Sequence, residues 1–408
     1  TVVRSMKTAA IRGLRVAQHA LNVGLPQLRK QSAWGSYARA QTTGLPTLRA
    51  ASCNTGTSGR RFSTEAYNPE WTPTGIEGGV DTNLLPWIEI PDAPGCSFKP
   101  LRVSDETGMF SIVMRMKKGT VQPDLVHLGP ADFMVLSGKM TYPEGPMAGT
   151  LEAGTWGYVP ADASISGLVA DEDVEYLMNL HGPLAFINQD QSVRSLFKGS
   201  DVRSAAHKRG ITLVPSTLAE CMQDRPPAYS GPPEPLALSA EGAAARLTVA
   251  EGIVADGKKT HPHFVDTKSI PWFESMPGIG LKILRVSEET GVVTTMVKHN
   301  AAAPPHYHLG ASDFMMLAGR LGYRAGPPEG YGPGVWFFEP NGARHESTQN
   351  VTDEDCIYLA NIYGPIQFDT GVGTPIAAVL SWMSYLEMSK VSGSPLVTNV
   401  FPKDSTRL

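Results

Sequence analysis

Three histidines in the second half of the chain have the types and spacing of a metal site. His306 and His308 stand one residue apart in "PPHYHLGASDFMMLAG" (304–319), and His345 follows in "EPNGARHES" (339–347). In a β-strand, residues i and i+2 face the same side, so the first two imidazoles are expected on one face. Three converging neutral imidazoles bind a divalent transition metal and leave positions open for other ligands.

A near repeat earlier in the chain tests this prediction. The stretch "QPDLVHLGPADFMVLSG" (122–138) has Leu125 where the later stretch has His306, and Ile165 is the counterpart of His345. A lone buried histidine is more often a core residue than a ligand. Burying imidazoles where Leu and Ile also serve costs free energy unless they find partners, and a metal is an obvious partner. The comparison therefore favours His306 and His345 as ligands.

His308 has a counterpart that is conserved within the chain, because His127 and Asp132 stand where the later copy has His308 and Asp313. A structural His–Asp pair is therefore expected in both copies. In the second copy His308 can in addition be a ligand. Asp313 would then either orient His308 or coordinate the metal itself.

Glu339 replaces Val159 of the first copy and is a candidate base, or an anchor for a substrate hydroxyl, near the metal. The alternative is a strand end that faces solvent. A second His-x-His pair, His261 and His263, lies in the Lys-rich "DGKKTHPHF" with Pro262 between the two histidines, and is expected at the surface.

The repeat extends over most of the chain and predicts a tandem duplication. Four pairs of segments match in order: 80–108 with 265–291, 127–142 with 308–323, 154–160 with 334–340, and 175–183 with 357–365. Each copy consists of short apolar or alternating runs separated by Gly and Pro, which predicts an all-β fold. We expect two jelly-roll barrels with minor terminal helices, one of them over 375–390.

Charge divides the chain unevenly. Residues 1–64 hold ten Lys and Arg and no Asp or Glu, although the whole chain is at −4. This basic, Ser- and Arg-rich start is typical of a mitochondrial targeting peptide, with a chloroplast transit peptide or a basic tail as the alternatives. The acidic remainder argues against nucleic acid as a partner, and no apolar run is long enough to cross a membrane. The predicted organisation is a targeting peptide at 1–62, a first barrel at 63–200, a linker at 201–260 and a metal-binding barrel at 261–408.

The motifs "PWFESMPGIGLKILRVSEETG", "PHYHLG…DFMMLAG" and "GVWFFEPNGARHE" resemble the bicupins, in particular the ChrR-like cupin group that includes 2,4′-dihydroxyacetophenone dioxygenase. The resemblance covers roughly 75–190 and 262–390. It implies double-stranded β-helix barrels and Fe(II) held by His306, His308 and His345. It also implies a dioxygenase that uses O2 to cleave a carbon–carbon bond beside a carbonyl, in a β-diketone or hydroxyketone substrate. The chain departs from the family in having Asp313 where Glu is usual, and the first copy, which keeps only His127, is expected to be metal-free.

Two other functions fit the same residues. One is a non-catalytic Zn-binding sensor or structural module, and the other is a Mn- or Zn-dependent isomerase or hydrolase. A homodimer is a further expectation, although two barrels in one chain can pair with each other. We expect a mitochondrial matrix protein.

Overall fold

The computed structural model describes residues 79–221, 223, 226–238, 261–322, 327–345, 348–369 and 374–400, all within the compact unit Asn68–Leu408. The side chains of His345 and Gln349 are outside this description. The predicted targeting peptide, 1–62, and the later part of the predicted linker also lie outside the described residues.

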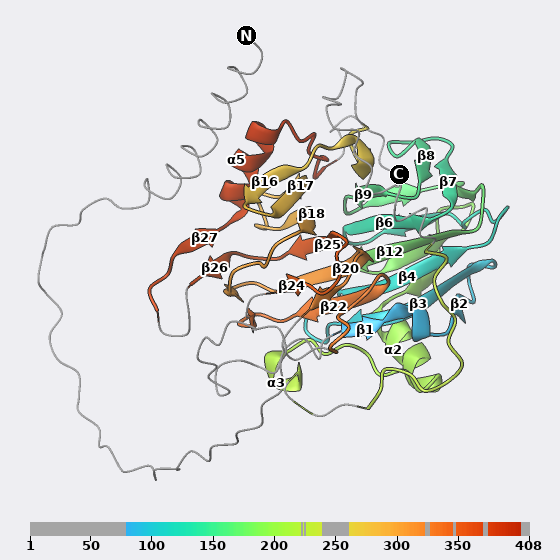
Figure 1. The fold of residues 1–408 in the computed structure, drawn as a ribbon. Helices are drawn as coiled ribbons and strands as arrows, with labels where there is room; N and C mark the ends of the chain where they lie inside the picture. Colours follow the sequence, from blue (N-terminus) through green and yellow to red (C-terminus); the bar gives the residue numbers. More distant parts are fainter. Residues whose placement is uncertain are drawn as a thin grey trace, which may run out of the picture. The chain divides into compact units, whose positions relative to one another are not determined.

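The first copy is a barrel of antiparallel strands (Figure 1). Its large sheet has the order β15-β9-β6-β12-β4-β3-β2, formed by Phe264–Asp266, Thr155–Val159, Ala131–Ser137, Val174–Leu180, Phe110–Met116, Cys96–Val103 and Ile88–Glu89. A four-stranded sheet contains β10 (Ala163–Ile165), β5 (Leu125–His127), β13 (Leu184–Ile187) and β14 (Val193–Phe197). A third sheet contains β11 (Val169–Ala170), β7 (Lys139–Tyr142) and β8 (Gly149–Glu152). Buried side chains of all three sheets share one core.

The second copy repeats this arrangement. Its large sheet has the order β1-β22-β20-β25-β18-β17-β16, formed by Gly79–Asp81, Val335–Glu339, Ser312–Ala318, Cys356–Ile362, Val293–His299, Ile279–Val286 and Phe273–Met276. A four-stranded sheet contains β23 (Arg344–His345), β19 (His306–His308), β26 (Ile366–Phe368) and β27 (Ala378–Leu380). A two-stranded sheet contains β21 (Leu321–Gly322) and β24 (Gln349–Asn350). The predicted all-β duplication is confirmed.

The two copies exchange their first strands. β1 begins the first copy but pairs with β22 of the second, and β15 begins the second copy but pairs with β9 of the first (Figure 1). The outer faces of the two large sheets also share a core that includes Trp156 and Trp336, both fully buried. Each strand of these sheets therefore has one row of side chains in its own barrel and one row between the copies.

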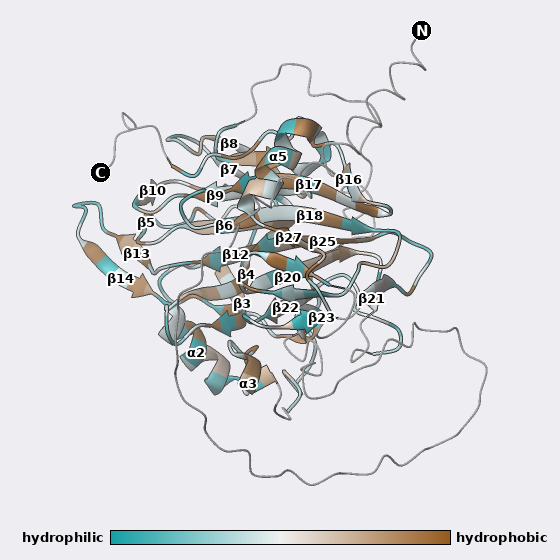
Figure 2. Ribbon diagram, turned by 90° about the vertical axis from the view of Figure 1, so that its left-hand side faces the viewer, coloured by the Kyte–Doolittle hydropathy of each residue, from teal (hydrophilic) through white to brown (hydrophobic). Residues whose placement is uncertain are grey.

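Helices follow the strands of each copy: α2 (Gly199–Lys208) and α3 (Leu218–Cys221) after the first, and α5 (Trp382–Ser392) after the second. Hydrophilic and hydrophobic residues alternate along α2 (Figure 2), and Val202 and Ala206 are buried. The helix predicted over 375–390 begins only at Trp382, because β27 pairs with β26 first. None of the described helices is long and apolar enough to cross a membrane.

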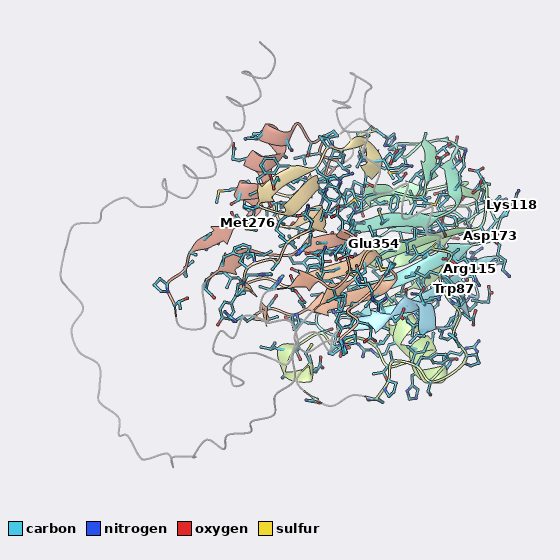
Figure 3. The ribbon with its side chains drawn as sticks, in the orientation of Figure 1. Trp87, Arg115, Lys118, Asp173, Met276 and Glu354 are labelled. Atoms are coloured by element: carbon cyan, nitrogen blue, oxygen red, sulfur yellow. The ribbon has the colours of Figure 1, made fainter. Side chains whose placement is uncertain are left out.

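The outer edge of the first copy is closed by side-chain contacts (Figure 3). The Arg115 guanidinium lies 4.3 Å from the centroid of the Trp87 ring, and Asp173 accepts a hydrogen bond of 2.7 Å from the backbone of Lys118. These contacts join β4 to the residues that precede β2, and the loop after β4 to the loop before β12.

Candidate metal centre

The strand register brings the three predicted ligands together on the backbone. His306 and His308 are the first and last residues of β19, and His306 is directly opposite His345 of β23. The equivalent strands of the first copy pair Leu125 with Ile165 in the same way. Leu125 and Ile165 therefore occupy the same places in the first barrel as His306 and His345 occupy in the second.

Hydrogen bonds fix the orientation of the two described imidazoles. His306 Nδ1 lies 2.9 Å from the backbone oxygen of Pro304, and His308 Nδ1 lies 2.7 Å from Ser312 Oγ. A carbonyl only accepts, so Nδ1 of His306 carries the proton and the lone pair of the neutral ring is on Nε2. Histidines that bind metals typically make this kind of outer hydrogen bond.

Glu339 completes a buried polar cluster with His308. Its carboxylate is 2% exposed, and Oε2 lies 2.9 Å from His308 Nε2, which is equally buried. Glu339 therefore does not face solvent. Imidazoles are ligands that a divalent transition metal takes, and the carboxylate beside them can act as a base or an anchor for a substrate.

A complete ligand set is not given by the described side chains alone. Among these residues, no group of three or more His, Cys, Asp or Glu is placed to hold a metal ion. The third predicted ligand, His345, is described only by its backbone. The set His306, His308 and His345 therefore stays a prediction.

Asp313 lies in a different part of the molecule from the histidine cluster. On β20, Ser312, Phe314 and Met316 face the barrel, whereas Asp313 and Met315 face the other copy. Asp313 accepts hydrogen bonds from Tyr363 Oη at 2.5 Å and from Asn361 Nδ2 at 3.2 Å.

Asp132 of the first copy meets Asp313 at this interface. Asn361 donates to both carboxyl groups, at 3.1 Å to Asp132, and Asn179 donates to Asp132 at 3.0 Å. Burial raises the pKa of both groups, and the charge of Asp132 raises the pKa of Asp313 further. We infer that the pair resists losing both protons near neutral pH.

The first copy lacks the polar cluster. The positions of Ser312 and Glu339 are occupied by Ala131 and Val159, which pair across β6 and β9 as Ser312 and Glu339 pair across β20 and β22. His127 remains, but no described residue bonds its Nδ1 atom, and burial lowers its pKa to about 4.

The predicted His127–Asp132 pair is therefore wrong. The strand alternation of β6 turns Ala131 inward and Asp132 toward the other copy.

Two polar groups inside the second barrel were not predicted from the sequence. Ser312 bonds His308, and comparison with Ala131 would have revealed it. His299 Nε2 lies 2.8 Å from Tyr358 Oη, and it occupies the position of Met116 in the first copy. Burial raises the pKa of Tyr358 well above its usual value, and the neighbouring Cys356 and Glu339 raise it further. The interior of the second barrel therefore has polar residues at positions where the first barrel has apolar ones.

The expectation that His261 and His263 lie at the surface is wrong for His263. Its side chain is 1% exposed, and its backbone N–H donates to His261 Nδ1 at 3.1 Å. The His261 ring stacks on Phe264 with 3.7 Å between centroids. β15 joins the sheet of the first copy, which covers His263.

Comparison with known families supports this picture of two related barrels. A family model described as a ChrR cupin-like domain matches residues 77–185 and again 260–365, more than half of the chain. The chain belongs to the ChrR cupin-like family. As a cupin with two matched domains it is a bicupin, as the repeat predicted.

Enzymes from Acinetobacter johnsonii and Bacillus subtilis resemble the chain, with 25% identity or less over the matched residues. The acetylacetone-cleaving enzyme of Acinetobacter johnsonii is 25% identical over 115 residues, which cover 28% of this chain and 75% of that protein. A crystal structure of an acetylacetone dioxygenase from the same organism matches 38% of this chain and 97% of its own, at 17% identity and a TM-score of 0.28. A deletion variant of oxalate decarboxylase from Bacillus subtilis matches 74% of this chain and 78% of its own, at 16% identity and a TM-score of 0.41. Matches this distant carry no activity over to the chain.

Proposed function

We propose that the second barrel is an Fe(II) centre of a dioxygenase that cleaves a carbon–carbon bond beside a carbonyl group. The proposed ligands are His306, His308 and His345, because directly opposed residues of an antiparallel pair share one face. The observation that carries the proposal is the buried approach of His308 Nε2 and Glu339 Oε2 to 2.9 Å at positions where the first copy has no second polar group.

The metal, when bound, supplies a Lewis acid and a site for oxygen beside a chelated substrate. The chain holds the site in three ways. Pro304 and Ser312 orient the imidazoles, and the apolar side chains Phe314 and Phe368 exclude water around them. Glu339 would accept the proton that a β-diketone loses on forming its enolate, and its Oε2, 2.9 Å from His308 Nε2, places this base beside the proposed metal position.

Substrates of this class match the distant relatives, one of which is named for cleaving acetylacetone. Neutral histidine ligands leave the full charge of the metal uncompensated, and this charge favours an anionic enolate. Partners on this proposal are a small carbonyl compound and O2.

The test combines metal analysis with oxygen uptake. Protein purified without oxygen is assayed for bound Fe, Zn and Mn, then for oxygen consumption with acetylacetone and with hydroxyketones. Iron and substrate-dependent oxygen uptake support the proposal. Zinc without oxygen uptake would indicate the sensor or structural module instead, and turnover without oxygen uptake would indicate an isomerase or hydrolase.

We propose in addition that residues 1–62 direct the chain to mitochondria, given their ten basic and no acidic residues. A fluorescent protein fused behind this segment should accumulate in mitochondria and lose the segment. Arg60 and Arg61 directly precede the end of this segment at residue 62, where removal of the peptide is expected. A variant in which both become Ala should still be imported, but its peptide should be cleaved differently. Diffuse fluorescence of the first fusion would contradict the proposal.

A further inference from the structure

A cleft of about 670 Å³ lies between the two copies, away from the metal centre. Its walls are the turn between β3 and β4, the segment after α2, and Phe338 and Tyr363 of the second copy. Phe338 faces this cleft, whereas the next residue, Glu339, faces the barrel. The two sites are therefore on opposite faces of β22.

In the second copy, the arginine at the equivalent position has its acceptor within the chain itself. After each barrel a short segment returns to the large sheet: Val214 N–H donates to Leu101 O at 2.8 Å, and Val397 N–H donates to Leu284 O at 2.9 Å. Val214 and Val397 occupy equivalent positions in the repeat, as do Leu101 and Leu284. The residues two positions after the valines, Ser216 and Asn399, are therefore equivalent as well, although they differ in type.

That difference leaves the Nε–H of one arginine without an acceptor among the described residues. In the second copy, the Asn399 side chain donates to Val286 O at 2.9 Å and accepts from Arg285 Nε at 2.5 Å. Ser216, its equivalent, donates to the corresponding carbonyl at 3.4 Å. Its shorter side chain does not reach Arg102, the equivalent of Arg285, and no described residue accepts a hydrogen bond from Arg102 Nε.

Arg102 forms the base of the cleft. It is 6% exposed, and its guanidinium lies 3.6 Å from the centroid of the Phe338 ring. A buried Nε–H group that has no acceptor is costly. The planar fork of its N–H groups matches a carboxylate.

The other charges of the cleft select for a single negative charge. Arg203 is already paired with Asp105, and Glu220 accepts hydrogen bonds from two backbone N–H groups. Glu106 is exposed at the same rim. Three carboxylates around the entrance disfavour a dianion such as phosphate, whereas Arg102 at the base still favours a monoanion.

We propose that this cleft binds a small monocarboxylate, whose carboxylate accepts hydrogen bonds from Arg102 and whose apolar part lies along Leu213 and Met109. The bound oxygen takes the place that the Asn399 amide oxygen has in the second copy.

Isothermal titration of the full chain with benzoate tests this assignment, with neutral benzamide as the matched probe. Benzoate should bind saturably and at least tenfold more tightly than benzamide. Ser216→Asn supplies the missing amide inside the cleft, so it should weaken benzoate at least tenfold and raise the midpoint of thermal unfolding. Arg102→Lys should also weaken benzoate, whereas Arg285→Lys, at the equivalent position of the second copy, should leave benzoate affinity unchanged.

Binding must also be separated from the metal centre. Benzoate affinity should be the same in His306→Leu as in the wild type, because that residue lies inside the second barrel. The proposal is overturned if benzoate does not bind at millimolar concentration, if Ser216→Asn binds it as well as the wild type, or if His306→Leu abolishes the binding.

Discussion

The interiors of the two barrels have the same strands and the same register but different chemistry. Where the second barrel has His306, Ser312 and Glu339, the first has Leu125, Ala131 and Val159. Both folds are complete, so the strand framework does not require polar groups at these positions. The second barrel nevertheless buries a carboxylate and imidazoles together, an arrangement that is costly without a shared partner. The difference shows that the barrel fold does not need this polar cluster, as is expected if the cluster forms the proposed metal centre.

The largest effect is expected from giving the second barrel the residue of the first. His306→Leu should abolish metal binding and leave the fold intact, because Leu125 occupies this place in the other copy. A metal present at a hundred times its dissociation constant stabilises the wild type by about 2.7 kcal/mol. EDTA should therefore lower the thermal midpoint of the wild type and leave that of the variant unchanged. An equal response to EDTA in both proteins would contradict the comparison.

Glu339→Val should act chiefly on turnover. Losing a positioned base costs about 10²–10⁴-fold in rate, and the variant should keep its fold because Val159 is the natural equivalent. Substrate-dependent oxygen uptake is the measurement, and Glu339→Gln, which keeps the size but not the basicity, is the control. Activity close to that of the wild type in Glu339→Gln would show that the carboxylate is not a base.

Ser312→Ala should have a smaller effect, on metal affinity. Removing a group that orients a ligand histidine typically costs about 10–100-fold in affinity. Competition with a chelator of known affinity measures this loss, and Ser312→Thr, which keeps the hydroxyl, should recover most of it. An unchanged affinity in the alanine variant would assign Ser312 to packing.

The prediction that affects the metal centre least concerns Asp313, which lies between the barrels. Its pKa is raised to about 7, against about 3.9 in an unfolded chain. The folded state therefore binds more protons across this window, and its stability falls as pH rises from about 4 to 7. Asp313→Asn removes this dependence. Its stability relative to the wild type should rise by about 1–3 kcal/mol between pH 5 and pH 8.

Denaturant unfolding at several pH values measures this difference. Asp353→Asn, at an exposed carboxyl, is the control and should show no such trend. If the free energies of unfolding of Asp313→Asn and the wild type differ by the same amount at every pH, the raised pKa of Asp313 is contradicted.

Much of the fold and the ligand register could be predicted because the chain contains its own comparison. The pairing of Leu125 with Ile165 and of His306 with His345 follows once the repeats are aligned. The face of Asp313 could not be predicted from His308, because the turn between them breaks the two-residue periodicity that defines a face. The exchange of β1 and β15 was equally hidden, since strands of three residues have too little pattern to show their partners.

The central claim is that the chain has one metal centre, in the second barrel. Anaerobic titration of metal-free protein with Fe(II) tests it most directly. We predict one tight site per chain, absent in His306→Leu and unchanged in His127→Leu, which removes the one histidine of this set that the first barrel keeps. Two sites per chain, no site, or loss of the site in His127→Leu would contradict the account.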